Sequence, residues 1–235
     1  MSWDPVWETV YRTRAWGQYP GEDVIRFVKA HFGAVPDRSA VKLLEVGSGA
    51  GANLWFMARE GFCTHGIEGS QTAVRLTQQR LDRECPQWRE AGGQVSTGDL
   101  AVLPYPDATF DAVLDVVAIC YCGFEAAAAA YAELARVTKP GGKLFARTFA
   151  RGCWGDGTGT PAGPGMWRCN EGPLSGLGAT RFTAEDEVPA MLRGWKVDRI
   201  ERAAQTEGDR AHEIRHLLIY GTRADEGAGA REGRA

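Results

Sequence analysis

Residues 41–51 read Val41-Lys42-Leu43-Leu44-Glu45-Val46-Gly47-Ser48-Gly49-Ala50-Gly51, a short apolar run that ends in three glycines. In the segment that follows, Leu54, Met57 and Ala58 share the spacing of one helical face. This order predicts a strand, a tight turn and a helix. Glycines permit such a turn because they adopt backbone angles that other residues avoid.

The same strand-and-helix pattern recurs along the chain. A strand over 64–67 ends at Glu68, and Ser70 can cap the helix that follows. Residues 110–119 are a continuous apolar run, which is typical of a strand buried on both faces of a parallel sheet. An alanine-rich helix over 125–137 stops before Pro140, and another strand follows over 143–149. We therefore expect an α/β fold, with a doubly wound, mainly parallel sheet and helices on both faces.

The pattern breaks in the C-terminal third. Residues 151–180 contain nine glycines and three prolines, so we expect a long active-site loop. A helix over 184–192 and two strands, 196–202 and 212–222, predict a terminal antiparallel hairpin. We expect one domain over 1–223 that starts with a helical cap over 1–38, and a disordered tail over 224–235.

Composition and charge exclude several classes of protein. The chain has 235 residues, of which 44% are hydrophobic and 24% charged, as in folded globular proteins. A formal net charge of -3 provides no positive field for nucleic acid or an anionic membrane. Asp115 interrupts the longest apolar stretch, 112–124, and no signal peptide is evident, so we expect a cytoplasmic protein. The six cysteines form no C-x-x-C pair, and we expect no metal.

The glycine motif alone leaves two classes of enzyme open. Gly47, Gly49 and Ala52 also satisfy the dinucleotide pattern G-x-G-x-x-A, which fits a nicotinamide-dependent oxidoreductase. Glu45 argues against it, because a carboxylate repels a pyrophosphate but suits an ammonium group. Glu68 ends the second strand, where it can bind two ribose hydroxyls, and a carboxylate such as Asp99 can accept a hydrogen bond from an adenine amino group.

Five motifs in order resemble those of small-molecule class I S-adenosylmethionine-dependent methyltransferases. They are Leu43 to Gly51, Gly66-Ile67-Glu68, Gly98-Asp99, Leu103-Pro104-Tyr105-Pro106-Asp107 with Phe110-Asp111, and Arg136-Val137-Thr138-Lys139-Pro140-Gly141-Gly142. The resemblance covers about residues 40–150. It implies a seven-stranded sheet with an antiparallel last strand and S-adenosylmethionine as cofactor. Its methionine part would be held by Glu45 and the glycines, its ribose by Glu68 and its adenine by Asp99 with Leu100. A non-catalytic protein that binds the same cofactor stays an alternative.

The predicted cofactor site has further members around these acids. The full set is Glu45, Gly47, Ser48, Gly49, Gly51, Asn53, Glu68, Gly69, Ser70, Gly98, Asp99, Leu100, Asp115, Trp16 and Tyr19. Trp16 and Tyr19 are included as aromatic covers, because rings stabilise a sulfonium cation. Trp3, Trp7 and Tyr11 have helical spacing and are predicted to pack a helix onto the sheet, with closure over the cofactor as the alternative.

The acceptor is expected to be a small molecule methylated on oxygen or nitrogen, such as a secondary metabolite or a sugar. His212 is the candidate general base, because an antiparallel last strand would begin at the carboxyl ends of the others; a polar residue at a strand end is the alternative. The expected substrate-binding residues are Cys120, Tyr121, Arg147 and Trp154. Asp115-Val116-Val117-Ala118 differs from the Asn/Asp-Pro-Pro-aromatic motif of DNA amine methyltransferases, so nucleic acid is not the expected substrate. We expect a monomer or homodimer.

Overall fold

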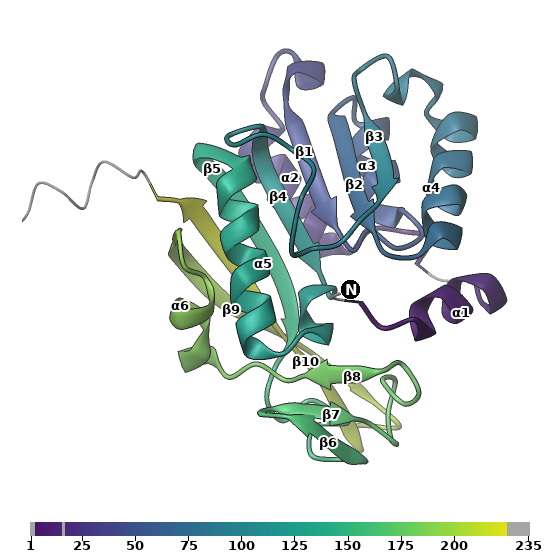
Figure 1. The fold of residues 1–235 in the computed structure, drawn as a ribbon, viewed down its shortest axis with the longest axis vertical. Coiled ribbons are helices and arrows are strands. Elements are labelled where there is room, and N and C mark those ends of the chain that lie inside the picture. The colour runs from purple at the N-terminus through teal and green to yellow at the C-terminus, as the bar shows by residue number, and fades with distance from the viewer. Residues whose placement is uncertain (1–2, 16, 225–235) are drawn as a thin grey trace, which may run out of the picture.

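The computed structural model describes residues 3–15 and 17–224 (Figure 1). Its α-helices are α1 (Val6–Thr13), α2 (Glu22–Phe32), α3 (Ala52–Arg59), α4 (Gln71–Glu84), α5 (Phe124–Val137) and α6 (Val188–Met191). Its strands are β1 (Lys42–Val46), β2 (Cys63–Glu68), β3 (Gln94–Thr97), β4 (Phe110–Val116), β5 (Thr138–Phe149), β6 (Thr160–Gly163), β7 (Met166–Arg168), β8 (Ala179–Arg181), β9 (Trp195–Glu207) and β10 (His212–Arg223). Short 3-10 turns lie at Arg38–Ala40, Pro86–Trp88, Ile119–Tyr121 and Glu185–Glu187. The tail from residue 225 and Trp16 lie outside the described residues.

Seven strands form the main sheet, in the order β3-β2-β1-β4-β5-β10-β9. The first five pair in parallel, whereas β10 runs antiparallel between β5 and β9. The sequence prediction of a mainly parallel, seven-stranded sheet with an antiparallel last strand is confirmed. The predicted terminal hairpin is β9 and β10. No described helix is both long and apolar enough to cross a membrane.

Alternation along the strands builds a core on each face of the sheet. In β1, Leu43 packs with the helices α2 and α3, and Leu44 packs with α5 and α6 on the other face. Ala112 and Val113 of β4 divide in the same way. Successive side chains of a strand point to opposite faces, so a run that is apolar at every position needs helices on both sides. Figure 1 shows α5 in front of the sheet and α2 behind it.

Residues 151–180 differ from the predicted loop, because they include the strands of a small antiparallel sheet, β6-β7-β8. Each strand has only three or four residues, too few for an alternating pattern to be visible in the sequence. Arg181 connects this small sheet to the turn after β4. Its Nε donates to the carbonyl of Cys122 at 3.3 Å, and its Nη1 donates to Thr183 at 2.9 Å. The small sheet lies beyond the carboxyl end of β5 (Figure 1).

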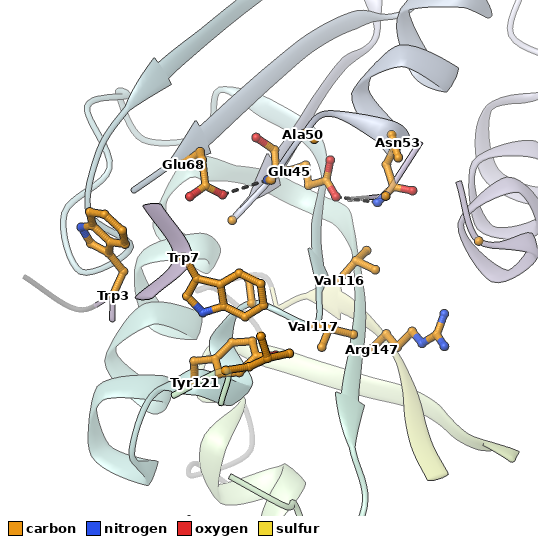
Figure 2. Close-up of a pocket in the computed structure, with 18 of the residues that line it drawn as sticks. Trp3, Trp7, Glu45, Ala50, Asn53, Glu68, Val116, Val117, Tyr121 and Arg147 are labelled. Atoms are coloured by element: carbon orange, nitrogen blue, oxygen red, sulfur yellow. Dashed lines mark hydrogen bonds between the residues drawn. The ribbon is translucent and has the colours of Figure 1, made fainter. Parts of the chain in front are cut away.

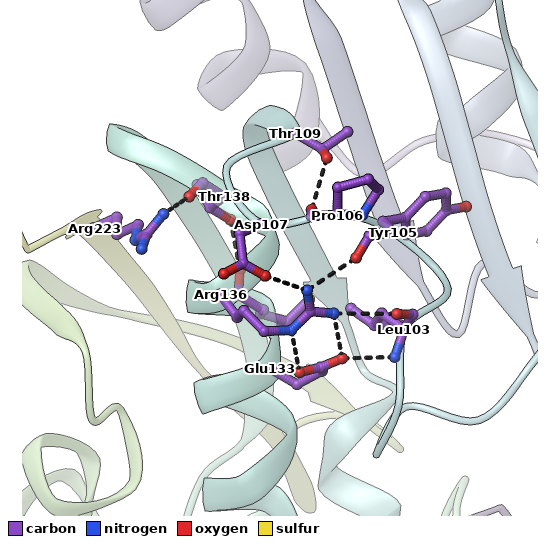
Figure 3. Close-up of polar contacts among 10 residues, drawn as sticks. Leu103, Tyr105, Pro106, Asp107, Thr109, Glu133, Arg136, Thr138 and Arg223 are labelled. Atoms are coloured by element: carbon purple, nitrogen blue, oxygen red, sulfur yellow. Dashed lines mark hydrogen bonds and ion pairs between the residues drawn. The ribbon is translucent and has the colours of Figure 1, made fainter.

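Arg136 of α5 holds the loop that follows β3 (Figure 3). Its guanidinium donates to Glu133 Oε2 at 2.8 Å, to Asp107 Oδ1 at 2.6 Å, and to the carbonyls of Tyr105 at 2.9 Å and Leu103 at 3.1 Å. Glu133 in turn accepts the Leu103 amide at 2.8 Å. A single side chain therefore satisfies the polar backbone of a loop that has no regular structure of its own.

Replacing this arginine should loosen the loop. We expect Arg136→Met to lower the free energy of unfolding by about 2 kcal/mol, because charge-assisted hydrogen bonds are lost and loop carbonyls lose their donor. Urea unfolding measures the change. The matched control is Arg83→Met, whose exposed side chain pairs only with neighbouring Glu84 and should change stability by less than about 0.5 kcal/mol. Equal effects of the two substitutions would contradict the role given to Arg136.

Candidate active site

A cavity of about 520 Å³ opens at the carboxyl ends of the central parallel strands (Figure 2). Glu45 of β1, Glu68 of β2, Val116 of β4 and Arg147 of β5 line it. This is where sheets of this type bind ligands, because the strand order reverses there and leaves a crevice. We call the part around Glu45 and Glu68 the acidic end, and the part around Phe149 and Ile214 the apolar end.

Two glycines shape the acidic end. Gly47 and Gly49 have φ values of 60° and 53°, which side chains other than glycine rarely adopt. A Cβ on Gly47 would lie 2.2 Å from that of Ala118 at the end of β4. The turn also places the Gly49 amide beside β2, where it donates to Glu68 Oε2 at 2.8 Å. The chain therefore folds back tightly, and the glycines allow Ala118 and Tyr11 to lie close against the turn.

Glu45 is buried, and only one of its oxygens is satisfied. Oε1 accepts a hydrogen bond from Asn53 Nδ2 at 2.6 Å, whereas Oε2 is buried with no partner in the structure. Burial raises the pKa of Glu45 to about 8; the Asn53 hydrogen bond opposes this shift, and the nearby Glu68 charge adds to it. A buried carboxylate with a free oxygen is costly, so this group is prepared for a cationic hydrogen-bond donor.

Glu68 is held by backbone amides on both sides. Besides the Gly49 amide on Oε2, the Ser70 amide donates to Oε1 at 2.9 Å. Burial raises the pKa of Glu68, and the backbone hydrogen bonds oppose that rise. Each carboxylate oxygen has two lone pairs, so both oxygens can accept a second hydrogen bond from a ligand hydroxyl.

Aromatic side chains from the N-terminal segment cover the cavity, which corrects the prediction that they pack a helix onto the sheet. Trp3, Trp7 and Tyr11 all line the cavity. Trp7 packs edge-on against Tyr121 with ring centroids 4.9 Å apart, and Figure 2 shows Trp7 above Tyr121. Helical spacing places these rings on one face but does not say what that face covers. Of the two predicted covers, Tyr19 lines the cavity and is largely exposed.

The N-terminal helix is anchored to the start of α4 by Glu8. Its Oε2 accepts from the Ser70 hydroxyl at 2.6 Å, and its Oε1 accepts from the Thr72 hydroxyl at 2.5 Å. These hydrogen bonds hold the pKa of Glu8 below its usual value. A carboxylate at a helix N-terminus is also favoured by the helix dipole. Ser70 therefore supports the aromatic cover and does not itself line the cavity.

His212, the predicted base, lies outside the cavity. The register pairs His216 with Phe149, the last residue of β5, so β10 begins four residues beyond that edge. His212 is exposed and stacks on Trp154 with ring centroids 3.8 Å apart. The predictions that His212 acts in the site and that Trp154 contacts substrate are therefore wrong. The β9–β10 hairpin extends beyond the carboxyl end of β5, and the sequence does not reveal how far it extends.

The apolar end contains a histidine and an arginine. His216 lines the cavity, and its Nδ1 lies 3.4 Å from Arg147 Nη2. Arg147 Nη1 lies 3.3 Å from Asp23 Oδ2 of α2. Burial, followed by the Arg147 charge, lowers the pKa of His216 to about 4, so the ring is neutral at neutral pH.

The remaining predicted residues divide into two groups. Those that line the cavity are Gly47, Ser48, Gly49, Asn53, Gly69, Gly98, Leu100, Tyr121 and Arg147. Those that do not line it are Gly51, Ser70, Asp99, Asp115 and Cys120. Asp115 is corrected as a ligand residue: it is fully buried and accepts from the amides of Ala118 and Ile119, each at 3.0 Å, and from the Tyr131 hydroxyl at 2.6 Å. It shapes the turn after β4.

The sequence analysis missed most of the apolar lining. Phe149 is the last residue of the strand predicted over 143–149, so its place beside the cavity had a visible signal. Leu174 and Leu177 come from the glycine-rich segment and Ile214 from the hairpin, and only the tertiary fold brings them together.

The motif region is similar in sequence to known methyltransferases. Residues 44–146 match the family model described as a methyltransferase domain. A demethylmenaquinone methyltransferase of Tropheryma whipplei is 32% identical over 109 residues, which are 46% of this chain and 42% of the relative. A malonyl-[acyl-carrier protein] O-methyltransferase of Erwinia pyrifoliae is 32% identical over 114 residues, 48% of this chain and 39% of the relative. The chain thus spans about two fifths of the length of these curated relatives.

A solved structure matches nearly the whole chain. It comes from work on the conversion of a disulfide bond into a thioacetal group during echinomycin biosynthesis. It superposes with a TM-score of 0.69 at 17% identity and covers 95% of this chain and 93% of its own. At this identity the likeness establishes the fold and leaves the chemistry to the residues of the site.

The buried Glu45 carboxyl should make the stability of the protein depend on pH. Its pKa is higher in the folded state than in the unfolded state, so its contribution is full below about pH 4.5 and is lost as the pH rises toward 8. We expect Glu45→Gln to remove up to about 1.4 kcal/mol per pH unit of this slope between pH 5 and 8. Urea unfolding at several pH values measures it, with exposed Glu90→Gln as control. Parallel curves for E45Q and wild type would contradict a buried, protonated Glu45.

Proposed function

We propose that residues 44–146, which match a methyltransferase domain, form a class I, S-adenosylmethionine-dependent methyltransferase domain, and that the chain moves a methyl group from S-adenosylmethionine to an oxygen or nitrogen of a small molecule. The observation that carries the proposal is the cavity itself. It joins an acidic end, suited to an amino acid and a ribose, to an apolar end with room for an acceptor.

The residues of the acidic end fit this cofactor. Glu45 Oε2 is buried without a partner, as expected for a carboxylate that pairs with the ammonium of a methionine group. Gly47 and Gly49 both line the cavity, and neither adds a side chain of its own to the space beside the turn. Glu68 retains free lone pairs for two ribose hydroxyls, and Gly98 with Leu100 line the side of the cavity next to β2, where an adenine would lie.

The chain's own contribution to the reaction is alignment and exclusion of water. When bound, S-adenosylmethionine supplies an electrophilic methyl group on a sulfonium. Such a transfer is an in-line displacement, so the protein gains most from fixing the two partners at near-attack distance. Trp7 packs against Tyr121 at the cavity, and Tyr11 and Val117 also line it, so these side chains would limit the access of water to the reacting atoms. Aromatic rings near the sulfonium also stabilise its charge.

The apolar end favours an acceptor with a hydrophobic body over a free sugar. Phe149, Leu174, Leu177 and Ile214 are each less than a tenth exposed and leave few polar partners for sugar hydroxyls. We expect a secondary metabolite or a similar ring-containing compound. A cytoplasmic location stays a prediction.

Calorimetry followed by a turnover assay tests the proposal. Purified chain should bind S-adenosylhomocysteine and transfer a labelled methyl group to members of an acceptor panel. Binding of NADH with no heat from S-adenosylhomocysteine would favour an oxidoreductase. Cofactor binding with no transfer to any acceptor in a broad panel would favour a non-catalytic binding protein.

Glu68 should be needed for cofactor affinity. We expect Glu68→Gln to weaken S-adenosylhomocysteine binding about tenfold, because the amide keeps one acceptor and loses the charge. Calorimetry measures the change, and circular dichroism checks the fold. Exposed Glu90→Gln should bind as wild type does. Unchanged affinity in folded E68Q would show that Glu68 does not contact the ribose.

A further inference from the structure

The apolar end of the cavity contains a positive charge with few partners. Among the described residues that line the whole cavity, Arg147 is the only lysine or arginine. It stands in register with Val116 of β4, and its carbonyl accepts from the Val117 amide at 2.9 Å. The guanidinium therefore lies beside the end of β4, where the apolar end of the cavity borders the acidic end.

The hydrogen-bonding capacity of Arg147 is incompletely used. Nη1 lies 3.3 Å from Asp23 and Nη2 lies 3.4 Å from His216, both long for charge-assisted hydrogen bonds. Its Nε is buried and has no partner in the structure. The side chain is 27% exposed and gains little from such long contacts, so an anionic oxygen reached by a small rotation of the side chain would add a charge-assisted hydrogen bond.

His216 presents a donor to the cavity rather than a base. A guanidinium can only donate, so the Nδ1 lone pair of His216 faces Arg147 and the ring proton lies on Nε2. Phe149 holds the ring in place, with centroids 4.9 Å apart. Arg147 and His216 thus form a pair of hydrogen-bond donors on one face of the sheet.

Among the described residues that line the apolar end, none is free to take a proton from the acceptor. The Asp4 carboxylate accepts from the Val6 amide at 3.0 Å and pairs with Arg168 at 3.5 Å. Tyr121 and Cys122, which line the same region, are held protonated by burial, which raises the pKa of each. Asp23 is engaged with Arg147 and with the Val24 amide. Glu45 and Glu68 lie at the acidic end, where the proposed cofactor binds.

We propose that the acceptor is an oxygen acid on an apolar body, which enters already ionised and is held by the Arg147 guanidinium and the His216 Nε2–H. This inference rests on the proposed methyltransferase function and narrows its acceptor to an acidic enol, a phenol acidic enough to be ionised at neutral pH, or a carboxylic acid. The anionic oxygen forms the new bond to the methyl carbon as the carbon–sulfur bond breaks, and that electron pair stays on sulfur. The products are a neutral methyl ether or ester and S-adenosylhomocysteine, so no base is needed.

A competing role for Arg147 is to bind the carboxylate of the cofactor itself. The two roles differ in which ligand loses affinity when the charge is removed. Arg147→Met removes the charge and keeps most of the side-chain volume, and Arg147→Lys keeps the charge. Arg202→Met is the matched control, because Arg202 is an exposed residue of the outer strand β9 and pairs with Glu185.

Calorimetry with three probes of similar size tests the proposal in the presence of saturating S-adenosylhomocysteine. The probes are 2-naphthoate, ionised 4-hydroxycoumarin and neutral 2-naphthalenemethanol. We expect the wild type to bind at least one anion about tenfold or more tightly than the alcohol, as suits a charge-assisted contact. R147M should lose that preference, whereas R147K and R202M should keep it. The two anions distinguish a carboxylate from an enolate acceptor, and labelled cofactor should give an ester or an ether accordingly.

Three results would overturn the proposal. The first is a wild type that binds no anion more tightly than the alcohol, including the case in which no probe binds. The second is R147M with an intact anion preference. The third is R147M that loses affinity for S-adenosylhomocysteine more than for the anions, which would assign Arg147 to the cofactor. Failure of the wild type to bind S-adenosylhomocysteine is a separate outcome, which refutes the proposed function itself.

Discussion

The hydrogen bond from the Gly49 amide to Glu68 joins the ends of two neighbouring strands and fixes the site. It forms only because Gly47 and Gly49 take left-handed backbone angles, which turn the chain before it enters α3. The same turn buries Glu45 beside Glu68, so two carboxyls face a single cavity. Burial raises the pKa of both groups and the Glu68 charge adds to the rise at Glu45, so a cationic or hydroxyl-bearing ligand relieves the cost of ionising them.

The cavity is closed by parts of the chain that are distant in sequence. The N-terminal helix supplies Trp7 and Tyr11, and Glu8 ties that helix to the start of α4. The opposite wall comes from the segment between β5 and β9, which Arg181 anchors to the turn after β4. A ligand at the sheet edge is therefore enclosed on both sides, while the sheet keeps its acids in fixed positions. In this arrangement the sheet supplies the geometry that comes with the fold, and other segments of the chain form the walls that select an acceptor.

The structure brings predicted site residues to the cavity where they lie at the ends of central strands. Glu45 and Glu68 follow apolar runs, and parallel strands bring their carboxyl ends to one edge, so their meeting was predictable. Asp115 lies one residue before such an end and points into a hydrogen-bonded turn. His212 failed for another reason, because β10 extends past the edge of β5 and carries it away from the cavity. His216, four residues further along β10, lines the cavity instead, and we propose that it donates a hydrogen bond there.

The sequence by itself determined the order of strands and helices, the glycine turn and the acids of the proposed cofactor site, because these depend on local backbone preference and on period-two burial. The tertiary structure alone decided what surrounds the acceptor. The small sheet β6-β7-β8, the overshoot of the β9-β10 hairpin and the meeting of Arg147 with His216 depend on long-range pairing and register. Those contacts leave no periodic signal in the sequence, since each involves short segments that are stable only when packed together.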